Sequence, residues 1–293
     1  MKYQLIDTVA ASLYHFLGHK LLEQEAFTIV TKGQTTPQGV DMSKLYPVVD
    51  KSIVDVEGYV WQSSVHNWNY ESGVATSPQP TVANGVYVNG AFKATNDAAY
   101  AHTIDYNNGR VIFSNPVSTD TLIQADFTYG ELSLIHSDSL PMLVNNDKPE
   151  FNSSLINYTL AADPASIYIP CILMELDSAG DEPFQMGGTN SIHPTFKFTI
   201  MGTTQQYVDR VADLFISQEK KALCLVNAEN WPLFMGTAGI SSSYSYLNTV
   251  NRKIQIATLE SVKYNRFLDR SELQKQPQVF AGIVRIEIFA VRN

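Results

Sequence analysis

The chain is 293 residues long, which is enough for two domains of ordinary size or for one large domain with a sizeable core. Hydrophobic residues make up 44% of the chain and charged residues 17%, so the composition excludes a disordered polymer and leaves much neutral polar surface for packing against partners. The formal net charge of −9 at pH 7 argues against a general nucleic-acid binder, because such a protein needs a basic face to displace counterions from phosphates.

The first residues, MKYQLIDTVAASLYHF, carry Asp7 where a signal peptide needs an uninterrupted apolar stretch. No window approaches the roughly 18 apolar residues of a membrane span, so we expect a protein that is made and kept in a cytoplasm, without a membrane partner. The two cysteines, Cys171 and Cys224, each lie in an apolar run that is typical of a strand. This placement predicts buried free thiols rather than a disulfide.

The N-terminal region, residues 1–49, is predicted to hold a helix followed by an extended arm. Apolar residues recur at spacings of three and four from Ile6 to Leu17, which predicts a helix over residues 4–24. The sequence AFTIVTKGQ then alternates as a strand and stops at Gly33. Two prolines and a glycine in TTPQGVDMSKLYP, residues 35–47, indicate a linker or arm.

Residues 50–145 read as short strands separated by turn signals about every ten residues, the pattern of a small antiparallel β-sandwich or barrel. The segment IDYNNGRVIF, residues 104–113, predicts a hairpin. Its Asn108 and Gly109 suit the positive φ angles of a type I′ turn. A second hairpin is predicted in ANGVYVNGAF, residues 83–92.

Residues 146–293 are predicted to form an α+β domain with one main helix on a mostly antiparallel sheet. Strands are expected in ASIYIPCILMEL and in PTFKFTIMG, where apolar and polar residues alternate. A helix follows over residues 203–221, with Thr203 or Thr204 as its N-cap. The apolar stripe expected on this helix is Val208, Val211, Leu214 and Phe215. Lys220 and Lys221 are expected at its C-terminal end, where positive charge suits the helix dipole.

The chain ends in strands again. RKIQIATLESVKY places Ile254 and Ile256 among polar residues, and GIVRIEIFAVRN alternates in the same way from Val284 to Ile288. The fold class predicted for the whole chain is therefore α+β, with an N-terminal helix, a β-rich module and a C-terminal α+β domain.

His15 and His19 lie four residues apart on the predicted helix, and Glu23 follows one turn later, so the three side chains are a candidate metal site. Residue 16 is Phe, and the glutamate that follows the first histidine in zinc proteases is absent. We therefore favour a polar helix face and expect no metal. The remaining histidines, His66, His102, His136 and His193, show no spacing of paired ligands.

No catalytic set emerges from the other reactive residues, so we expect a protein that is not an enzyme and that uses no cofactor. Apolar neighbours should raise the pKa of the Cys171 thiol and leave it inert. The segment MGGTN lacks the lysine of a phosphate-binding loop. GISSSYSY, residues 239–246, reads as a flexible or partner-contacting loop. Four carboxylates lie near predicted strands, but their spacing in the sequence does not identify any two of them as a general acid and base: Asp105, Asp126, Glu175 and Asp177.

The segment GYVWQSSVHNWNY contains four aromatic residues, Tyr59, Trp61, Trp68 and Tyr70. They could stack on sugars or bases. The alternative, which we favour, is that some of them fill the core of the β module and that the others meet a neighbouring subunit.

The sequence from ASIYIPCILMEL to KKALCLVN, residues 165–227, resembles the core of phage tail-terminator and neck proteins: a strand, a loop with a glycine pair, a strand, a helix that carries an aspartate, and an apolar strand. The positions that carry this resemblance are Gly187, Gly188, Asp209, Ala212 and Leu214. Separately, NGVYVNGAF, IDYNNGRVIFSNPV and IQADFTY resemble β-modules that recur in virion structural proteins of tailed phages.

The resemblance implies a virion subunit that joins a homo-oligomeric ring, usually of six, at the head-proximal end of the tail. Such a ring stops growth of the tail and contacts other neck, tail-tube or sheath proteins. Residues 252–261 or 282–292 would be edge strands for the ring contact, and residues 30–47 an arm over a neighbour. As a further hypothesis, the acidic balance would let DNA pass through the ring without sticking.

Two rival functions are weighed against this one. A baseplate or receptor-binding module that binds host surface glycans is suggested by the aromatic β segment. A hydrolase that acts on cell wall or polysaccharide has less support, because no paired carboxylate or metal motif identifies it.

Overall fold

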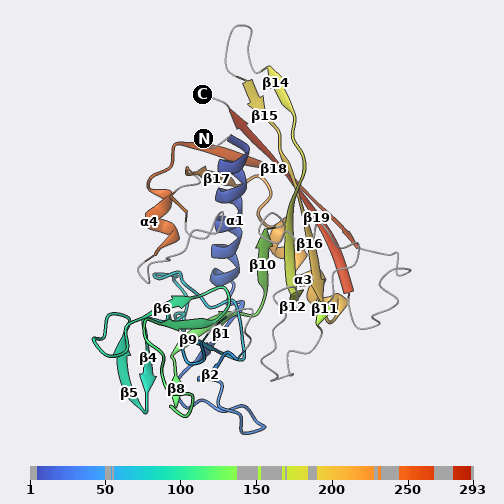
Figure 1. The fold of residues 1–293 in the computed structure, drawn as a ribbon. Coiled ribbons are helices and arrows are strands. Elements are labelled where there is room, and N and C mark those ends of the chain that lie inside the picture. The colour runs from blue at the N-terminus through green and yellow to red at the C-terminus, as the bar shows by residue number, and fades with distance from the viewer. Residues whose placement is uncertain are drawn as a thin grey trace.

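The computed structural model describes residues 5–49, 54, 56–136, 151–152, 167–168, 170–183, 190–227, 230–231, 244–266 and 280–291. Within these residues the fold is α+β, with an N-terminal helix and mostly antiparallel sheets that curl into half-barrels, which confirms the predicted class. Figure 1 shows two parts: a β module, and an α+β unit with the first helix lying along it.

The first helix, α1 (Leu5–Glu23), confirms the predicted span, and its partners lie in the C-terminal half of the chain. Its buried residues belong to one hydrophobic core with β-strand residues such as Phe198 and Ile286. The α+β unit therefore consists of α1 together with the described residues from Ser133 onward, and the β module is inserted between them. The structure thus departs from the predicted segment 1–49, because the apolar face of a helix must be covered by another element and here the C-terminal sheet covers it.

The predicted arm is part of the β module. Strand β1 (Phe27–Val30) pairs with β9 (Phe127–Gly130), and β2 (Lys44–Pro47) pairs with both β3 and β8. Leu45, in the middle of β2, is fully buried. The prediction of a free arm over residues 30–47 was wrong. A strand of three or four residues has too little sequence pattern of its own, and it forms because partner strands pair with it.

The β module has a seven-stranded sheet in the order β5-β4-β8-β2-β3-β7-β6, beside the ribbon of β1 and β9. A hydrophobic core that includes Trp61, Trp68 and Phe127 lies within the module, as expected for a small sandwich or barrel. The strands not yet bounded are β3 (Val60–Gln62), β4 (Gly85–Val88), β5 (Ala91–Ala94), β6 (His102–Asp105), β7 (Arg110–Phe113) and β8 (Ile123–Gln124).

Both predicted hairpins are present, but the turns differ. Between β4 and β5, Asn89 and Gly90 both have positive φ and form a two-residue turn. Between β6 and β7 the loop has four residues, and of Asn108 and Gly109 only Gly109 has positive φ. The type I′ prediction was wrong there, because the buried Tyr106 donates its hydroxyl to the Ala83 carbonyl and draws the loop onto the core.

Gly109 is the position in this loop that least tolerates a side chain. A Cβ there would lie 2.3 Å from the Val65 carbonyl oxygen, and its φ is +60°. We expect Gly109→Ala to lower the free energy of unfolding of the β module by at least about 2 kcal/mol, through the left-handed backbone and the clash together.

Gly33→Ala is the matched control for that substitution. Gly33 has φ +77° but nothing within 4 Å of a Cβ, so only the backbone term of about 1 kcal/mol applies. Urea unfolding of both variants measures the difference, and equal losses would show that the clash at Gly109 relaxes.

The main sheet of the α+β unit runs β10-β13-β16-β19, with β18 and then β17 continuing it and with β15 and β14 beside the end of β19. Strand β10 pairs with β13 in parallel, and the other pairs are antiparallel. The bounds in this unit are β10 (Ser133–His136), β11 (Phe151–Asn152), β12 (Ile167–Tyr168), β13 (Cys171–Ser178), β14 (Asp181–Pro183), β15 (Asn190–Ile192), β16 (Thr195–Gly202), α3 (Gln205–Ile216), β17 (Ala222–Leu225), α4 (Tyr246–Val250), β18 (Gln255–Arg266) and β19 (Phe280–Val291).

Helix α3 packs on this sheet through the predicted stripe. Phe215 contacts Phe198 of β16, with ring centroids 5.1 Å apart, and both side chains are fully buried. Thr204 is the N-cap, and its hydroxyl accepts a hydrogen bond from the Tyr207 amide. The lysine prediction was wrong: the helix ends at Ile216, and the Lys220 ammonium pairs with Glu260 on β18 instead of lying over the helix end.

Strand β19 is not an edge strand. It pairs with β16 on one side and with β18 on the other, so the prediction of a ring contact along residues 282–292 was wrong. The alternation from Val284 to Ile288 instead marks a fully buried face in the middle of the sheet. Strand β18 pairs with β17 only over Gln255–Thr258, and among the described residues its later part pairs on one side alone.

Candidate functional site

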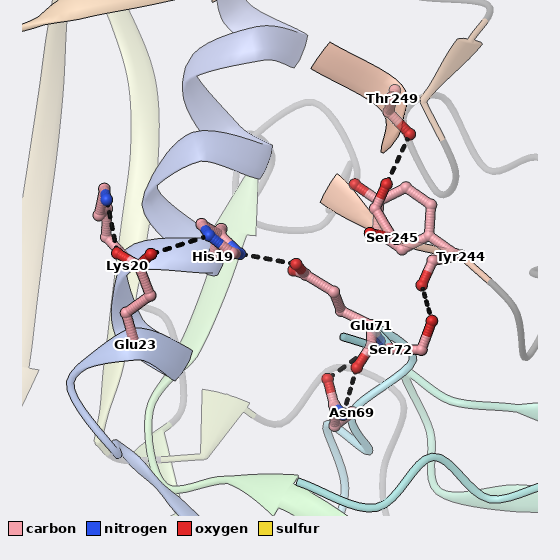
Figure 2. A network of polar contacts seen from close by, with 9 residues as sticks. All are labelled: His19, Lys20, Glu23, Asn69, Glu71, Ser72, Tyr244, Ser245 and Thr249. Atoms are coloured by element: carbon pink, nitrogen blue, oxygen red, sulfur yellow. Dashed lines mark hydrogen bonds and ion pairs between the residues drawn. The ribbon is translucent and has the colours of Figure 1, made fainter. Parts of the chain in front are cut away.

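The most concentrated group of buried polar side chains lies where three segments meet: α1, residues 69–72 of the β module, and residues 244–249 before and within α4. We call this place the joint. Figure 2 shows its hydrogen bonds and ion pairs, with His19 between two carboxylates. The joint is the place where the inserted module contacts the α+β unit through polar side chains.

His19 is the centre of the joint and is only 2% exposed. Its Nδ1 lies 2.6 Å from Oε1 of Glu71, and its Nε2 lies 3.1 Å from Oε1 of Glu23 one turn along α1. The ring also stacks on Tyr246, with centroids 4.5 Å apart. Both ring nitrogens therefore face carboxylate oxygens, and the ring is fixed from a third side by an aromatic neighbour.

Glu71 is held by its own loop and is 5% exposed. Asn69 donates its side-chain amide to the Glu71 carbonyl and accepts from the Glu71 amide. The next residue, Ser72, donates both its backbone amide and its hydroxyl to the Tyr244 carbonyl, at 2.8 and 2.7 Å. The loop is thus tied to the α+β unit at two successive residues.

Glu23 supplies the second carboxylate, which also forms an ion pair with the Lys20 ammonium. Burial alone would raise the pKa of the Glu23 carboxyl, but hydrogen bonds and charge from Lys20 and His19 outweigh burial and lower that pKa. Glu23 therefore favours its ionised form. Its stabilising contribution is present above the pKa of an unfolded glutamate and is lost as the pH falls through its own lowered pKa.

The candidate metal site does not form. His15 is 4% exposed and stacks on Trp231 with ring centroids 4.6 Å apart, while both nitrogens of His19 contact carboxylates. Among the described residues, no group of three or more His, Cys, Asp or Glu side chains is arranged to hold a metal ion. The favoured alternative, a polar helix face, was also wrong, because both histidines are buried against the C-terminal half of the chain.

Tyrosines surround the joint. Burial is the largest cause of the raised pKa values of Tyr70, Tyr244 and Tyr246, and nearby Glu71 adds to each shift. These phenols therefore stay neutral. The prediction that residues 239–246 form a flexible loop was wrong for Tyr246, which is 6% exposed and part of the core, whereas residues 239–243 lie outside the described residues.

The aromatic segment of the β module points inward. Trp61 and Trp68 are each 1% exposed, and Trp68 stacks on Phe127 with centroids 4.1 Å apart. Tyr59 and Tyr70 are partly buried at the margins of hydrophobic clusters. The core interpretation is confirmed for the two tryptophans, which present no open ring face for a sugar or a base.

The four carboxylates near strands lie in separate structural contacts. Asp105 accepts from the Asn108 amide, and Asp126 accepts from the Lys32 backbone and the Tyr87 hydroxyl. Two others form ion pairs across the outward face of the main sheet: Glu175 with Lys197 at 2.6 Å, and Asp177 with Arg285 at 3.0 Å.

Both cysteines are free thiols, as predicted. Cys171 is fully buried, and burial raises the pKa of its thiol to about 12, as its apolar neighbours indicated. Cys224 is half-buried, so the prediction of burial held for Cys171 only.

Of the positions that carried the family resemblance, Asp209 has the clearest contacts. On α3 its carboxylate accepts from Gln205, from the Tyr264 hydroxyl at 2.6 Å and from the Arg266 guanidinium. The Tyr264 hydrogen bond is the largest cause of the lowered pKa of Asp209, and Gln205 and Arg266 add to it. These bonds attach α3 to β18. Ala212 is buried on the face of α3 that meets the core, and Leu214 is partly buried at the margin of the core. Gly187 and Gly188 lie outside the described residues.

The other histidines are scattered. The Nδ1 of His66 contacts the Asn108 carbonyl and that of His102 the Tyr100 carbonyl, and burial lowers the pKa of both rings. His193 lies beside Phe289. The side chain of His136 lies outside the described residues.

No protein-family model, curated protein sequence or solved structure matches this chain. None of the helices in the described part of the chain has the length and apolar character needed to cross a membrane.

Sequence reasoning found only half of the joint. The four-residue spacing of His19 and Glu23 on a helix is visible in the sequence, whereas Glu71 is 52 positions from His19 and Tyr244 lies in the C-terminal half. No local signal joins them. An acidic residue directly after the aromatic run ending in Tyr70 was the one hint that a carboxylate would lie next to a core.

Proposed function

We propose that the chain is a structural subunit of a tailed-phage particle. In this proposal it assembles with copies of itself, in a ring of six, at the head-proximal end of the tail. The ring ends tail growth and joins the tail to the head through contacts with other neck, tail-tube or sheath proteins. The protein then works through its interfaces rather than through catalysis.

The observation that carries this proposal is the order of elements in the α+β unit. Strands β13 and β16, helix α3 and strand β17 occur in the order on which the family resemblance rests, with β14 and β15 between β13 and β16. Helix α1 is part of the core of this unit, so the β module is the only described part that would be an addition to a terminator-like fold. The described polar clusters hold the fold together, which suits a subunit that acts by assembly.

Among the described residues, we assign the ring contact to the surface around the start of β18. Ile254 and Ile256 are more than half exposed, at 53% and 58%; Ile254 lies directly before β18 and Ile256 is its second residue. The part of β18 from Ser261 onward leaves one side without a pairing strand among the described residues. An apolar start and an open edge on one strand suit a heterologous contact between identical chains.

Light scattering followed by electron microscopy tests the proposal. We expect the purified protein to form a closed ring with a central hole at high concentration. Ile256→Lys should leave the fold intact and shift the mass toward the monomer, because a lysine cannot be buried there without a partner charge. Val56→Lys is the matched control, since Val56 is 54% exposed on the β module, and it should leave the ring unchanged.

A different result would favour the rival binding function. If the protein remains a monomer at all concentrations and selects a glycan in an array screen, the receptor-binding or baseplate interpretation replaces the ring. Trp61 and Trp68 are buried and cannot stack on a glycan, so the receptor-binding interpretation would need other side chains.

A further inference from the structure

The β module is attached to the α+β unit through a narrow crossing. The chain leaves α1 and enters β1 near Ala26, and it returns from β9 toward β10 near Glu131. The Glu131 amide donates to the Ala26 carbonyl at 3.1 Å, so the two crossings lie side by side. Glu25, just before them, has φ +57°, which marks a sharp change of chain direction. Two adjacent strands at one crossing are the geometry of a hinge.

The joint lies next to this crossing, since Glu23 is three residues before Ala26, and it ties the module to the α+β unit through a second set of contacts. His19 holds Glu71, and the Tyr244 carbonyl accepts twice from Ser72. Ring contact between Tyr70 and Tyr244, with centroids 5.5 Å apart, adds an apolar component. With the joint closed, rotation about the crossing is blocked; with the joint open, the crossing at Ala26 and Glu131 remains.

The joint needs a definite number of protons. One axis joins Nδ1 of His19 to Glu71 and the other joins Nε2 to Glu23, and a hydrogen bond requires one proton on each axis. A neutral imidazole carries a single N–H, so two ionised carboxylates are both satisfied only when the ring is doubly protonated. When one proton leaves, the ring loses its positive charge: Glu23 is 36% exposed and keeps Lys20 as a partner, but the buried Glu71 carboxylate then has no cation within ion-pair distance among the described residues.

We propose that the joint is a proton-dependent latch on a hinged module: with two protons on the axes from Glu71 through His19 to Glu23 the β module is held against the α+β unit, and loss of one proton at higher pH releases residues 69–72. This inference does not depend on the virion proposal. It concerns only how the two parts of the chain are held together.

The other groups around His19 do not supply the missing proton. Lys20 and Glu23 face it from α1, Glu71 from the module, and Tyr246 from α4. The Lys20 ammonium binds the second oxygen of Glu23, away from the ring. Tyr246 presents its ring face, and burial keeps its phenol neutral by raising the pKa. The hydroxyl of Tyr244 is buried and makes no hydrogen bond to His19, Glu23 or Glu71 among the described residues.

Hydrogen exchange of the full chain, measured by mass spectrometry, tests the latch. We compare peptides that cover residues 67–74 at about pH 5 and about pH 9, which bracket the range in which imidazoles titrate, after correction for intrinsic exchange rates. Protection of the Ser72 amide should fall about 10- to 100-fold at the higher pH, the population change that loss of one charge-assisted hydrogen bond produces. Peptides from β4 and β16 should keep their protection, because both parts remain folded.

Glu71→Gln is the decisive variant. The glutamine amide donates a proton that does not titrate to Nδ1, while a neutral ring donates Nε2–H to Glu23, so both axes are satisfied at either pH. The variant should therefore keep residues 67–74 equally protected at both pH values. Lys20→Gln, which leaves both axes intact, should behave as the wild type does.

Equal protection at the two pH values in the wild type would overturn the proposal. So would the wild-type pH response persisting in Glu71→Gln. Because the wild-type comparison stands alone, the test still decides if the variant fails to fold.

Discussion

A chain that lacks residues 1–24 is expected to lose the fold of the α+β unit while the β module stays folded. Five large apolar side chains of α1 are buried in the core of that unit: Val9, Leu13, Phe16, Leu17 and Leu21. At about 1.5 to 3 kcal/mol each, their burial is worth roughly 7 to 15 kcal/mol, as much as the whole stability of an ordinary domain. The unit cannot tolerate that loss.

The three tryptophans of the chain report on the two parts separately. Trp61 and Trp68 lie in the core of the module, and Trp231 lies in the core of the α+β unit. In an NMR spectrum of the truncated chain, the indole signals of Trp61 and Trp68 should keep their native positions. The Trp231 signal should move to the position of an unfolded chain.

The matched control keeps α1 and removes the module. Because Ala26 and Glu131 are hydrogen bonded, a short Gly-Ser linker can replace residues 26–131 without straining the ends. This chain should keep the native Trp231 signal. A native Trp231 signal in the chain without α1 would show that the α+β unit folds without the helix, in spite of the place of α1 in its core.

Substitution of Trp68 by Ala is expected to lower the free energy of unfolding of the β module by about 3 to 5 kcal/mol, the usual cost of removing a large buried aromatic ring. Trp68 is 1% exposed, stacks on Phe127, and donates its indole N–H to the Ser63 hydroxyl at 3.2 Å. The substitution leaves a cavity and removes one hydrogen bond from the Ser63 hydroxyl, which keeps its hydrogen bonds with Val65. Urea unfolding followed through Trp61 measures the loss.

Phe92→Ala is the control for Trp68→Ala. Phe92 lies on β5 of the same module and is 50% exposed, so its removal should cost less than about 1 kcal/mol. The pair also separates two roles for the aromatic segment. A sugar platform would lose glycan binding without losing stability when Trp68 is removed, and that outcome would contradict the core assignment.

The joint places ionisable groups between the β module and the α+β unit. If the latch and the ring both hold, the module would turn about the crossing at Ala26 and Glu131 while the α+β unit keeps its contacts through β18. The two proposals fail separately, because the latch is read from residues 67–74 and the ring from the mass of the particle.

The sequence by itself determined the elements whose apolar residues repeat with a clear period. Helix α1, helix α3 with its cap at Thr204, and the long strands β16 and β19 all lie where the periodicity placed them. Both hairpins of the β module were also visible, because turn residues and alternating strands are local signals. The α+β class followed from the order of these elements.

Only the tertiary structure decided which faces meet. Periodicity shows that α1 has an apolar face but not that the C-terminal sheet covers it, so the helix was assigned to the wrong part of the chain. Strand β2 exists through its pairing with β3 and β8, and the turn before Gly109 follows from the burial of Tyr106. The joint likewise brings His19 to Glu71 across 52 positions. Contacts between distant residues depend on how whole elements pack, and no local pattern records that packing.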